Sequence, residues 1–367
     1  MQPIPILPQE TIFKKKHLQG LICLDPFMGV SIDLNGEIRL CSCSHWHPTV
    51  VGNILDNTLF EILNNDLSHK IRQSIRNGTY EYCNEDRCAI INNDRLTPVK
   101  YIDKTDSYNG LPSTFDRVFD KTIVDMPRYI YIAGDRICNL SCPSCRTKVI
   151  TEDDEKKTVH GQVIQKLNQQ VFSGSDPRPI TVYVSSTGEL LASPLTLNFL
   201  ETYPLSRFPK TEFNFQSNGL LFKKRWHRIQ HLKNNLYNLA ITADSCRPDV
   251  YSKLRRGGNF KDLEENLEFI SMLRTEINFK FSIRMVVQND NFDEIEDFYQ
   301  WATKYNVTDV EYLRISHWWN AFSTEEEFQK VDVLNKNHKH YQDTVNSLKR
   351  LKSLHKDKVV IYHFNLE

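Results

Sequence analysis

The sequence predicts an α/β fold with a partial (β/α)6 barrel, and three observations lead to that class. Strand-like and helix-like segments alternate six times between residues 128 and 316. Such alternation is typical of parallel strands joined by crossover helices, and six units are fewer than the eight of a closed barrel. Eight of the nine cysteines lie in two zones, 23–88 and 138–145. The second zone directly follows the first strand, and ligands in such folds lie at the carboxyl ends of strands.

The individual elements are predicted from their composition and periodicity. The expected strands are rich in aromatic and β-branched residues. They cover residues 128–134, 180–186, 212–218, 236–244, 278–287 and 309–316. The expected helices show apolar residues at helical spacing. They cover residues 158–172, 194–204, 221–235, 263–275 and 292–306.

Composition excludes several classes of protein. The 46 basic residues balance 46 acidic ones without a long run of either sign, which argues against nucleic acid or an anionic membrane as the main partner. The first residues lack an apolar stretch of signal-peptide length, and no stretch approaches the length of a membrane span. We therefore expect a cytoplasmic protein. In a reducing compartment, clustered thiols are more often metal ligands or catalytic groups than disulfides.

Three cysteines, Cys138, Cys142 and Cys145, form a C-x3-C-x2-C loop. Three thiolates leave one iron of a [4Fe–4S] cluster open, because such a cluster normally takes four cysteines. A zinc site would need a fourth Cys or His, and the nearest histidine, His160, lies in an expected helix. The loop therefore favours an open-iron cluster.

This loop resembles the signature of the radical S-adenosylmethionine (SAM) enzymes. In that family the open iron binds the amino and carboxylate groups of SAM, and an electron from the cluster generates a 5′-deoxyadenosyl radical. The resemblance also implies an external electron donor of the flavodoxin or ferredoxin type. One departure is Ser144, which stands where most members have an aromatic residue against the adenine.

The resemblance continues at the ends of the second and third strands. Gly188 and Glu189 match a Gly-Gly-Glu-like motif, with Thr187 in place of the first glycine, and the acidic residue would receive the SAM ammonium. A plain turn is the alternative at this position. Ser217 and Asn218 match the position that binds the ribose.

Further matches follow the fourth and fifth strands. Arg255 would pair with the SAM carboxylate, since a guanidinium fork fits a carboxylate, while the neighbouring Arg256 is interpreted as solvated. Asp244 would bind SAM, shape the site or face the substrate.

Three more polar residues are expected near the same cleft. Cys246 is interpreted as a spectator, with a substrate-side thiol as the alternative. Gln288 and Asn291 follow the fifth strand, and Asn291 is equally explained as a helix N-cap.

The first cysteine zone resembles the auxiliary-cluster domain called SPASM. The segment "GVSIDLNGEIRL" alternates around Asn-Gly, a hairpin signal that would bring Cys23 and Cys41 together. The resemblance implies one auxiliary [4Fe–4S] cluster on Cys23, Cys41, Cys83 and Cys88. A zinc site on the same thiols is the alternative.

Other residues of this zone stay open as ligands. Cys43 is the spare or the substitute for Cys41, and His45 and His47 are outside candidates.

We expect the chain to divide into four parts. A SPASM-like domain covers 1–95, a linker 96–127, the radical SAM core 128–320, and a helical extension with a final strand 321–367. Trp318 and Trp319 would cover the active site or pack at the edge of the core.

The resemblance implies a radical SAM enzyme of the oxidoreductase or epimerase type. It would abstract a hydrogen atom from a peptide or protein substrate, leading to crosslinking, epimerisation or oxidation. The same chemistry on a carbohydrate or aminoglycoside is one alternative, and a non-catalytic iron–sulfur or zinc-stabilised binding protein is another. No catalytic side chain is assigned.

Overall fold

The computed structural model describes residues 18–44, 46–85, 87–92, 94–102, 124, 127–133, 135–150, 154–174, 179–184, 188–317 and 321–362. The chain divides into two compact units. The first unit comprises residues 1–133, 154–183 and 204–212, and the second comprises residues 134–153, 184–203 and 213–367.

The second unit is built on parallel strands. Neighbouring strands follow one another in chain order, and every pair among them is parallel. They are β8 (Thr211–Ser217, of which residues 213–217 belong to this unit), β9 (Leu236–Thr242), β10 (Lys280–Val287), β11 (Asp309–Arg314) and β12 (Val359–Tyr362). The carboxyl ends of these strands therefore lie along one edge.

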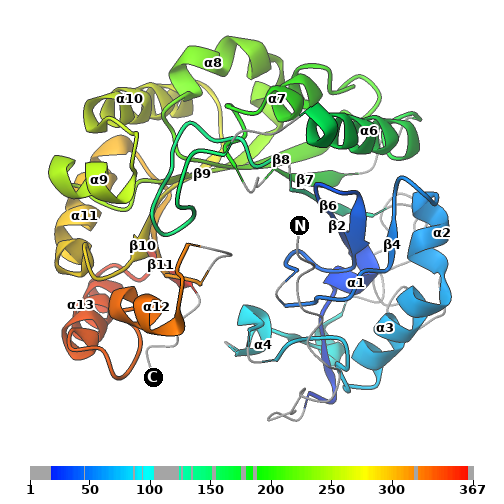
Figure 1. The fold of residues 1–367 in the computed structure, drawn as a ribbon, viewed down its shortest axis with the longest axis horizontal. Coiled ribbons are helices and arrows are strands. Elements are labelled where there is room, and N and C mark those ends of the chain that lie inside the picture. The colour runs from blue at the N-terminus through cyan, green and yellow to red at the C-terminus, as the bar shows by residue number, and fades with distance from the viewer. Residues whose placement is uncertain are drawn as a thin grey trace. The chain divides into compact units, whose positions relative to one another are not determined.

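Helices connect the parallel strands. The α-helices are α7 (Pro194–Glu201), α8 (Phe222–Ile229), α9 (Pro248–Leu254), α10 (Phe260–Glu276), α11 (Ile295–Ala302), α12 (Glu325–Val331) and α13 (Tyr341–Leu354). Short 3-10 turns are η4 (Gln230–Asn235), η5 (Phe292–Glu294) and η6 (Thr303–Tyr305). Helices α8, α10 and α11 cover the same face of the strands (Figure 1).

The core of the second unit follows from near-continuous apolar runs in its strands. Ile241 in β9 and Ile283 and Met285 in β10 are fully buried. Leu267 and Ile270 of α10, one helical turn apart, are buried as well. Strands that are covered by crossover helices show such runs rather than strict alternation.

The first unit combines a small mixed sheet with helices. Its sheet has the order β7-β6-β2-β3-β4, in which β2 pairs parallel with β6 and antiparallel with β3. The strands are β2 (Gly29–Ile32), β3 (Glu37–Arg39), β4 (Gly52–Asn53), β6 (Tyr129–Ile132) and β7 (Ile180–Val184, of which residues 180–183 belong to this unit). A separate pair joins β1 (Leu21–Ile22) to β5 (Thr97–Pro98). The helices are α1 (Asp25–Met28), α2 (Leu59–Asn64), α3 (Asp66–Arg76), α4 (Ala89–Asn92), the 3-10 turn η2 (Val99–Tyr101) and α6 (Asp154–Gln170).

The expected α/β class and all six expected strands are confirmed, with bounds that differ by one or two residues. The closure of these strands into a partial barrel of six units remains a prediction, as does the division into four parts. The hairpin expected after Cys23 is also present, because β2 and β3 pair antiparallel.

The expected linker 96–127 begins with a short strand. Thr97–Pro98 pairs with Leu21–Ile22, so this segment belongs to the first unit. Residues 103–123 lie outside the described residues, as do Trp318 and Trp319. Within the described ranges, no helix is long and apolar enough to cross a membrane.

Candidate functional site

The loop after β6 carries the C-x3-C-x2-C cysteines in a locally fixed conformation. The Asp135 carboxylate accepts from the Ile137 amide (2.9 Å) at the start of the loop. The amides of Cys145 and Arg146 both donate to the Cys142 carbonyl at 2.9 Å, forming one tight turn around the last two cysteines. Cys142 is buried, and the other two cysteines are half-buried.

Each of the three sulfur atoms accepts a hydrogen bond from an N–H group. The donors are the Leu140 amide to Cys138 (3.4 Å), Arg255 Nη1 to Cys142 (3.6 Å) and Arg146 Nη2 to Cys145 (3.4 Å). Burial raises the pKa of Cys138 to about 11 and raises that of Cys142 as well. A bound iron would offset this cost, because a metal ion favours the deprotonated thiol.

Gly188 packs directly against the cysteine loop. A Cβ atom on this residue would lie 2.2 Å from the Ile137 carbonyl oxygen and 2.9 Å from the Asp135 carbonyl oxygen. The next amide, that of Glu189, donates to the Ile137 carbonyl at 2.8 Å. Only a residue without a side chain permits this approach. In the structure Gly188 therefore brings the Glu189 segment against the loop.

Glu189 is a fully buried carboxylate that accepts three hydrogen bonds. The donors are the Ser217 hydroxyl (2.8 Å) and the Leu191 amide (3.3 Å) to Oε1, and the Asn218 amide (2.7 Å) to Oε2. Burial raises the pKa of Glu189, and these donors partly oppose the shift. A carboxylate has about four acceptor sites. Among the described residues, these donors leave one acceptor site on Oε2 for a cation, so Glu189 fits an ammonium group.

Ser217 and Asn218 lie at the end of β8, where the sequence placed them. The Ser217 hydroxyl donates to Glu189 and accepts from the Gly219 amide (3.0 Å). The side-chain nitrogen of Asn218, Nδ2, donates to Asn139 Oδ1 at 2.9 Å and lies 3.9 Å from the Cys138 sulfur. These residues therefore join the end of β8 to both Glu189 and the cysteine loop.

Asp244 and Arg255 form a buried ion pair beside the cysteines. Arg255 Nε lies 2.9 Å from Asp244 Oδ2, while its Nη1 reaches Cys142. Burial opposes the charge of Arg255, but Asp244 and the Cys142 sulfur outweigh it and raise the pKa of the guanidinium. Asp244 has a left-handed backbone with φ of 68°. Non-glycine residues in this region are uncommon and are often found at functional sites.

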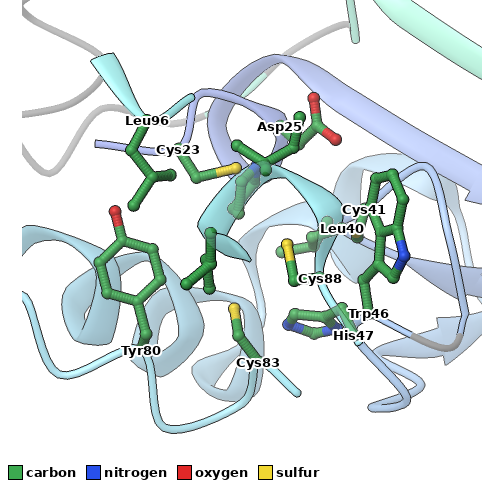
Figure 2. Close-up of a pocket in the computed structure, with 13 residues that line it drawn as sticks. Cys23, Asp25, Leu40, Cys41, Trp46, His47, Tyr80, Cys83, Cys88 and Leu96 are labelled. Carbon is green, nitrogen blue, oxygen red and sulfur yellow. The ribbon is translucent and has the colours of Figure 1, made fainter. Parts of the chain in front are cut away.

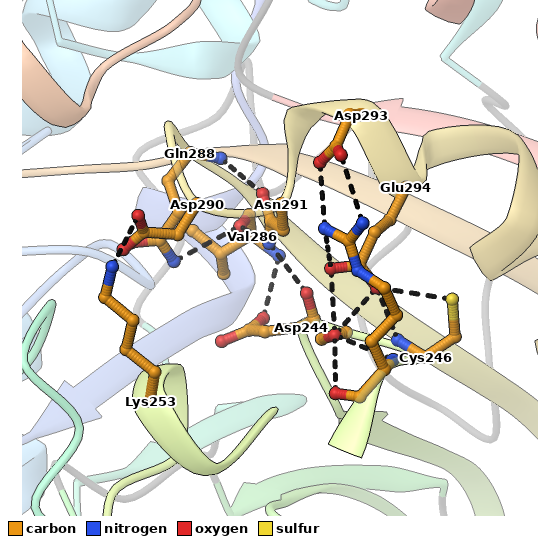
Figure 3. A network of polar contacts seen from close by, with 11 residues as sticks. Asp244, Cys246, Lys253, Val286, Gln288, Asp290, Asn291, Asp293 and Glu294 are labelled. Atoms are coloured by element: carbon orange, nitrogen blue, oxygen red, sulfur yellow. Dashed lines mark hydrogen bonds and ion pairs between the residues drawn. The ribbon is translucent and has the colours of Figure 1, made fainter. Parts of the chain in front are cut away.

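Asn291 holds Asp244 in place, and the sequence did not predict this role. Its side-chain nitrogen donates to the backbone carbonyls of Asp244 (2.7 Å) and Val286 (3.0 Å). Its side-chain oxygen accepts from the backbone N–H of Gln288 (2.8 Å). Figure 3 shows these bonds at the ends of β9 and β10. Asn291 occupies the N-cap position of η5 but makes no side-chain cap bond. The alternative interpretation as a capping side chain is therefore wrong.

Cys246 belongs to a second polar cluster in the same region (Figure 3). The buried Glu294 accepts from the Ser245 hydroxyl (2.7 Å), the Cys246 amide (2.9 Å) and the Cys246 thiol (3.3 Å). Burial and Glu294 raise the pKa of Cys246 to about 12. The Cys246 thiol donates to Glu294, and its interpretation as a spectator stays a prediction.

Two arginines of this region have roles that the sequence did not reveal. Arg256 donates to Ser141 Oγ (3.0 Å) and the Thr147 carbonyl (2.8 Å), so its interpretation as merely solvated is wrong. Arg146 donates to Cys145 and to the Arg136 carbonyl (2.8 Å). For Arg146, the position directly after the third cysteine was the one feature of the sequence that could have indicated a contact with the cysteine loop.

The first unit contains a pocket that gathers the other expected ligands. Its lining includes Cys23, Cys41, Cys83 and Cys88. The sulfur atoms of Cys23, Cys83 and Cys88 point toward the middle of the group (Figure 2). Burial raises the pKa of Cys23, of Cys41 and of Cys88, and the nearby Asp25 adds to each shift.

His47 also lines this pocket, whereas the structure does not place Cys43 in its lining. His47 is buried, and burial lowers its pKa to about 4. His45 lies outside the described residues.

Among the described residues, no three His, Cys, Asp or Glu side chains are close enough together to hold a single metal ion. A cubane cluster binds each cysteine to a different iron, so its ligands are farther apart than those of one ion.

Comparisons with known proteins agree with the cysteine patterns. Residues 23–89 match the family SPASM, described as an iron–sulfur cluster-binding domain. A GTP 3′,8-cyclase of Alkaliphilus metalliredigens (strain QYMF) is 28% identical over 174 residues, which are 46% of this chain and 51% of that protein. The chain thus spans about half the length of this curated relative.

Two solved structures are also similar at low identity. SuiB of Streptococcus suis, bound to the precursor peptide SuiA, has a TM-score of 0.44 and 11% identity, covering 94% of this chain and 73% of that one. The anSMEcpe structure with bound AdoMet has a TM-score of 0.42 and 17% identity, covering 64% of this chain and 62% of that one.

The family match in the first cysteine zone and the curated relative confirm the two resemblances that the cysteine motifs carry. The SPASM match indicates an iron–sulfur cluster as a cofactor of the first cysteine zone. The chain thus resembles the radical SAM enzymes, and its residues 23–89 match the SPASM iron–sulfur cluster-binding domain.

Proposed function

We propose that the chain is a radical SAM enzyme that abstracts a hydrogen atom from its substrate. Cys138, Cys142 and Cys145 would hold a [4Fe–4S] cluster that, with SAM bound, would supply one-electron cleavage of the sulfonium to methionine and a 5′-deoxyadenosyl radical, which would take the hydrogen atom. The electron comes from an external donor of the flavodoxin or ferredoxin type. The protein's residues hold the cofactor, orient it and exclude water.

The observation that carries this proposal is the convergence on one loop of three segments that follow β7, β8 and β9 along the chain. Gly188 approaches the backbone of the cysteine loop, Asn218 donates to Asn139 of that loop, and Arg255 reaches Cys142. The segments are up to 117 residues apart in sequence, counted from Cys138 to Arg255. A purely structural metal site would not require a buried carboxylate with one acceptor site left beside it.

The proposed roles follow from these contacts. Cys138, Cys142 and Cys145 would hold the core cluster, and Glu189 would receive the SAM ammonium. Ser217 and Asn218 orient Glu189 through their two hydrogen bonds to it. Arg255 would neutralise the charge near the SAM carboxylate, held in place by Asp244.

The first unit would carry the auxiliary cluster on Cys23, Cys41, Cys83 and Cys88. Such a cluster can bind the substrate or accept an electron during an oxidative outcome. The SPASM match favours a peptide or protein as the substrate class, with crosslinking, epimerisation or oxidation as the outcome.

The experiment is anaerobic reconstitution with iron and sulfide, followed by SAM and dithionite and an assay for 5′-deoxyadenosine. We expect 5′-deoxyadenosine from the full chain and none from a Cys142→Ser variant. Absence of the product from a protein that carries its full complement of about eight irons would contradict the proposal.

A further inference from the structure

The core cysteine loop receives two positively charged hydrogen-bond donors, one on each of two different thiols. Arg146 Nη2 lies 3.4 Å from the Cys145 sulfur, and Arg255 Nη1 lies 3.6 Å from the Cys142 sulfur. The third thiol, Cys138, accepts instead from two neutral donors, the Leu140 backbone amide and Asn218 Nδ2. The loop is therefore electrostatically asymmetric.

Both guanidinium groups are held by bonds to other groups. Arg146 is buried and donates through Nη1 to the Arg136 carbonyl at 2.8 Å. Arg255 is fixed by the ion pair with Asp244 at 2.9 Å. A donor that is fixed before a charge develops nearby stabilises that charge without reorganising.

These two guanidinium groups would affect the reduction potential of an iron–sulfur cluster bound by the loop. Adding one electron to a cluster makes its thiolate-ligated core more negative by one unit. Hydrogen bonds to the sulfur atoms and nearby positive charge stabilise the reduced form more than the oxidised form. They therefore raise the reduction potential.

We propose that Arg146 and Arg255 set the reduction potential of the core cluster by donating charged hydrogen bonds to Cys145 and Cys142. This inference rests on the proposed function, because it assumes that the three cysteines hold a cluster. Both arginines would act on the cluster through its cysteine ligands. Arg146, unlike Arg255, has no proposed contact with SAM.

The structure offers a matched control in Arg256. This residue holds the same loop, but it donates to the oxygen atoms of Ser141 and Thr147 and to the backbone carbonyl of Arg146. Removing its charge would loosen the loop without removing a donor from a sulfur atom. Comparing variants of Arg146 and Arg256 therefore separates an electrostatic effect on the cluster from an effect of a less rigid cysteine loop.

The test is a potentiometric titration of the reconstituted full chain, followed by EPR and without SAM or substrate. The signal of the core cluster is identified by its loss in a Cys142→Ser variant. We expect Arg146→Gln to shift the midpoint to a more negative potential. Arg146→Lys, which keeps the charge, and Arg256→Gln should stay close to the wild-type midpoint.

An unchanged midpoint in Arg146→Gln would overturn the inference, and so would an equal shift in Arg146→Lys or in Arg256→Gln. The pair Arg255→Gln and Arg255→Lys repeats the comparison at Cys142, in case one variant does not assemble its cluster. If the arginine variants show the expected shifts but the wild type makes no 5′-deoxyadenosine, only the proposed function fails. If it makes 5′-deoxyadenosine and the midpoint does not shift, only this inference fails.

Discussion

Glu189 is the residue on which the proposed cofactor site depends most. It lies in an environment that disfavours a bare negative charge, since burial raises its pKa. Three N–H and O–H donors compensate only part of this cost. A bound cation would restore the balance, and the ammonium group of SAM has the charge and the donors for it.

We expect Glu189→Gln to weaken SAM binding by roughly ten- to hundredfold, because one charge-assisted hydrogen bond contributes about 1.5–3 kcal/mol. The glutamine has nearly the same shape but no charge, and its amide group cannot accept at both positions. The measurement is anaerobic isothermal titration of SAM into the reconstituted protein.

The control for this substitution is Glu201→Gln, which removes a surface carboxylate that pairs with Arg228 on the neighbouring helix. This variant should bind SAM like the wild type. Wild-type SAM affinity in a Glu189→Gln protein with normal iron content would show that this carboxylate does not contact the ammonium.

The sequence could identify these side chains but not their contacts. Glu189 and Ser217 were recognised from motifs at strand ends, yet the hydrogen bond between them joins residues that are 28 positions apart. The contact of Arg255 with both Asp244 and Cys142 likewise depends on how two loops meet. Motif spacing does not contain that information.

At the scale of elements, the strands and helices were predictable because each has its own periodicity. Burial on both faces gives β9 a nearly continuous apolar run, and α10 repeats its apolar residues at helical spacing. Asn291 was not predictable, because a residue before a helical turn is expected to cap it. Its bonds instead join β10 to the residue after β9.

The close approach of Gly188 to the cysteine loop leads to a second prediction, for the substitution Gly188→Ala. The added methyl group would lie 2.2 Å from a backbone oxygen, so one of the two loops must move. We expect a loss of about 1–3 kcal/mol in the free energy of unfolding, the usual effect of overpacking. Urea denaturation followed by circular dichroism measures it, and the iron content should fall because the cysteine loop is displaced.

Gly161→Ala is the matched control, since nothing lies within 4 Å of the added methyl group in α6. Alanine in a helix interior should increase stability, by up to about 1 kcal/mol. The argument for close packing would be wrong if the two substitutions changed stability equally.

At the scale of the whole molecule, the chain carries two cysteine-rich sites, each within one of its two units. Cysteine spacing predicted both sites, because ligands of one cluster tend to be grouped in sequence. It left the choice between Cys41 and Cys43 open, since both lie near the end of the same hairpin. In the structure Cys41 is buried in the pocket lining, while Cys43 is half-buried.

Iron counting on single variants tests this choice. We expect Cys41→Ser to lose the auxiliary cluster and retain about four irons, because a cubane needs its cysteine ligands. Cys43→Ser, the same substitution two residues away, should retain about eight. Both variants should keep the EPR signal that is lost in Cys142→Ser, because the core cysteines lie in the other unit. The reverse iron contents would assign the ligand to Cys43, and full iron in both variants would mean that either thiol can serve.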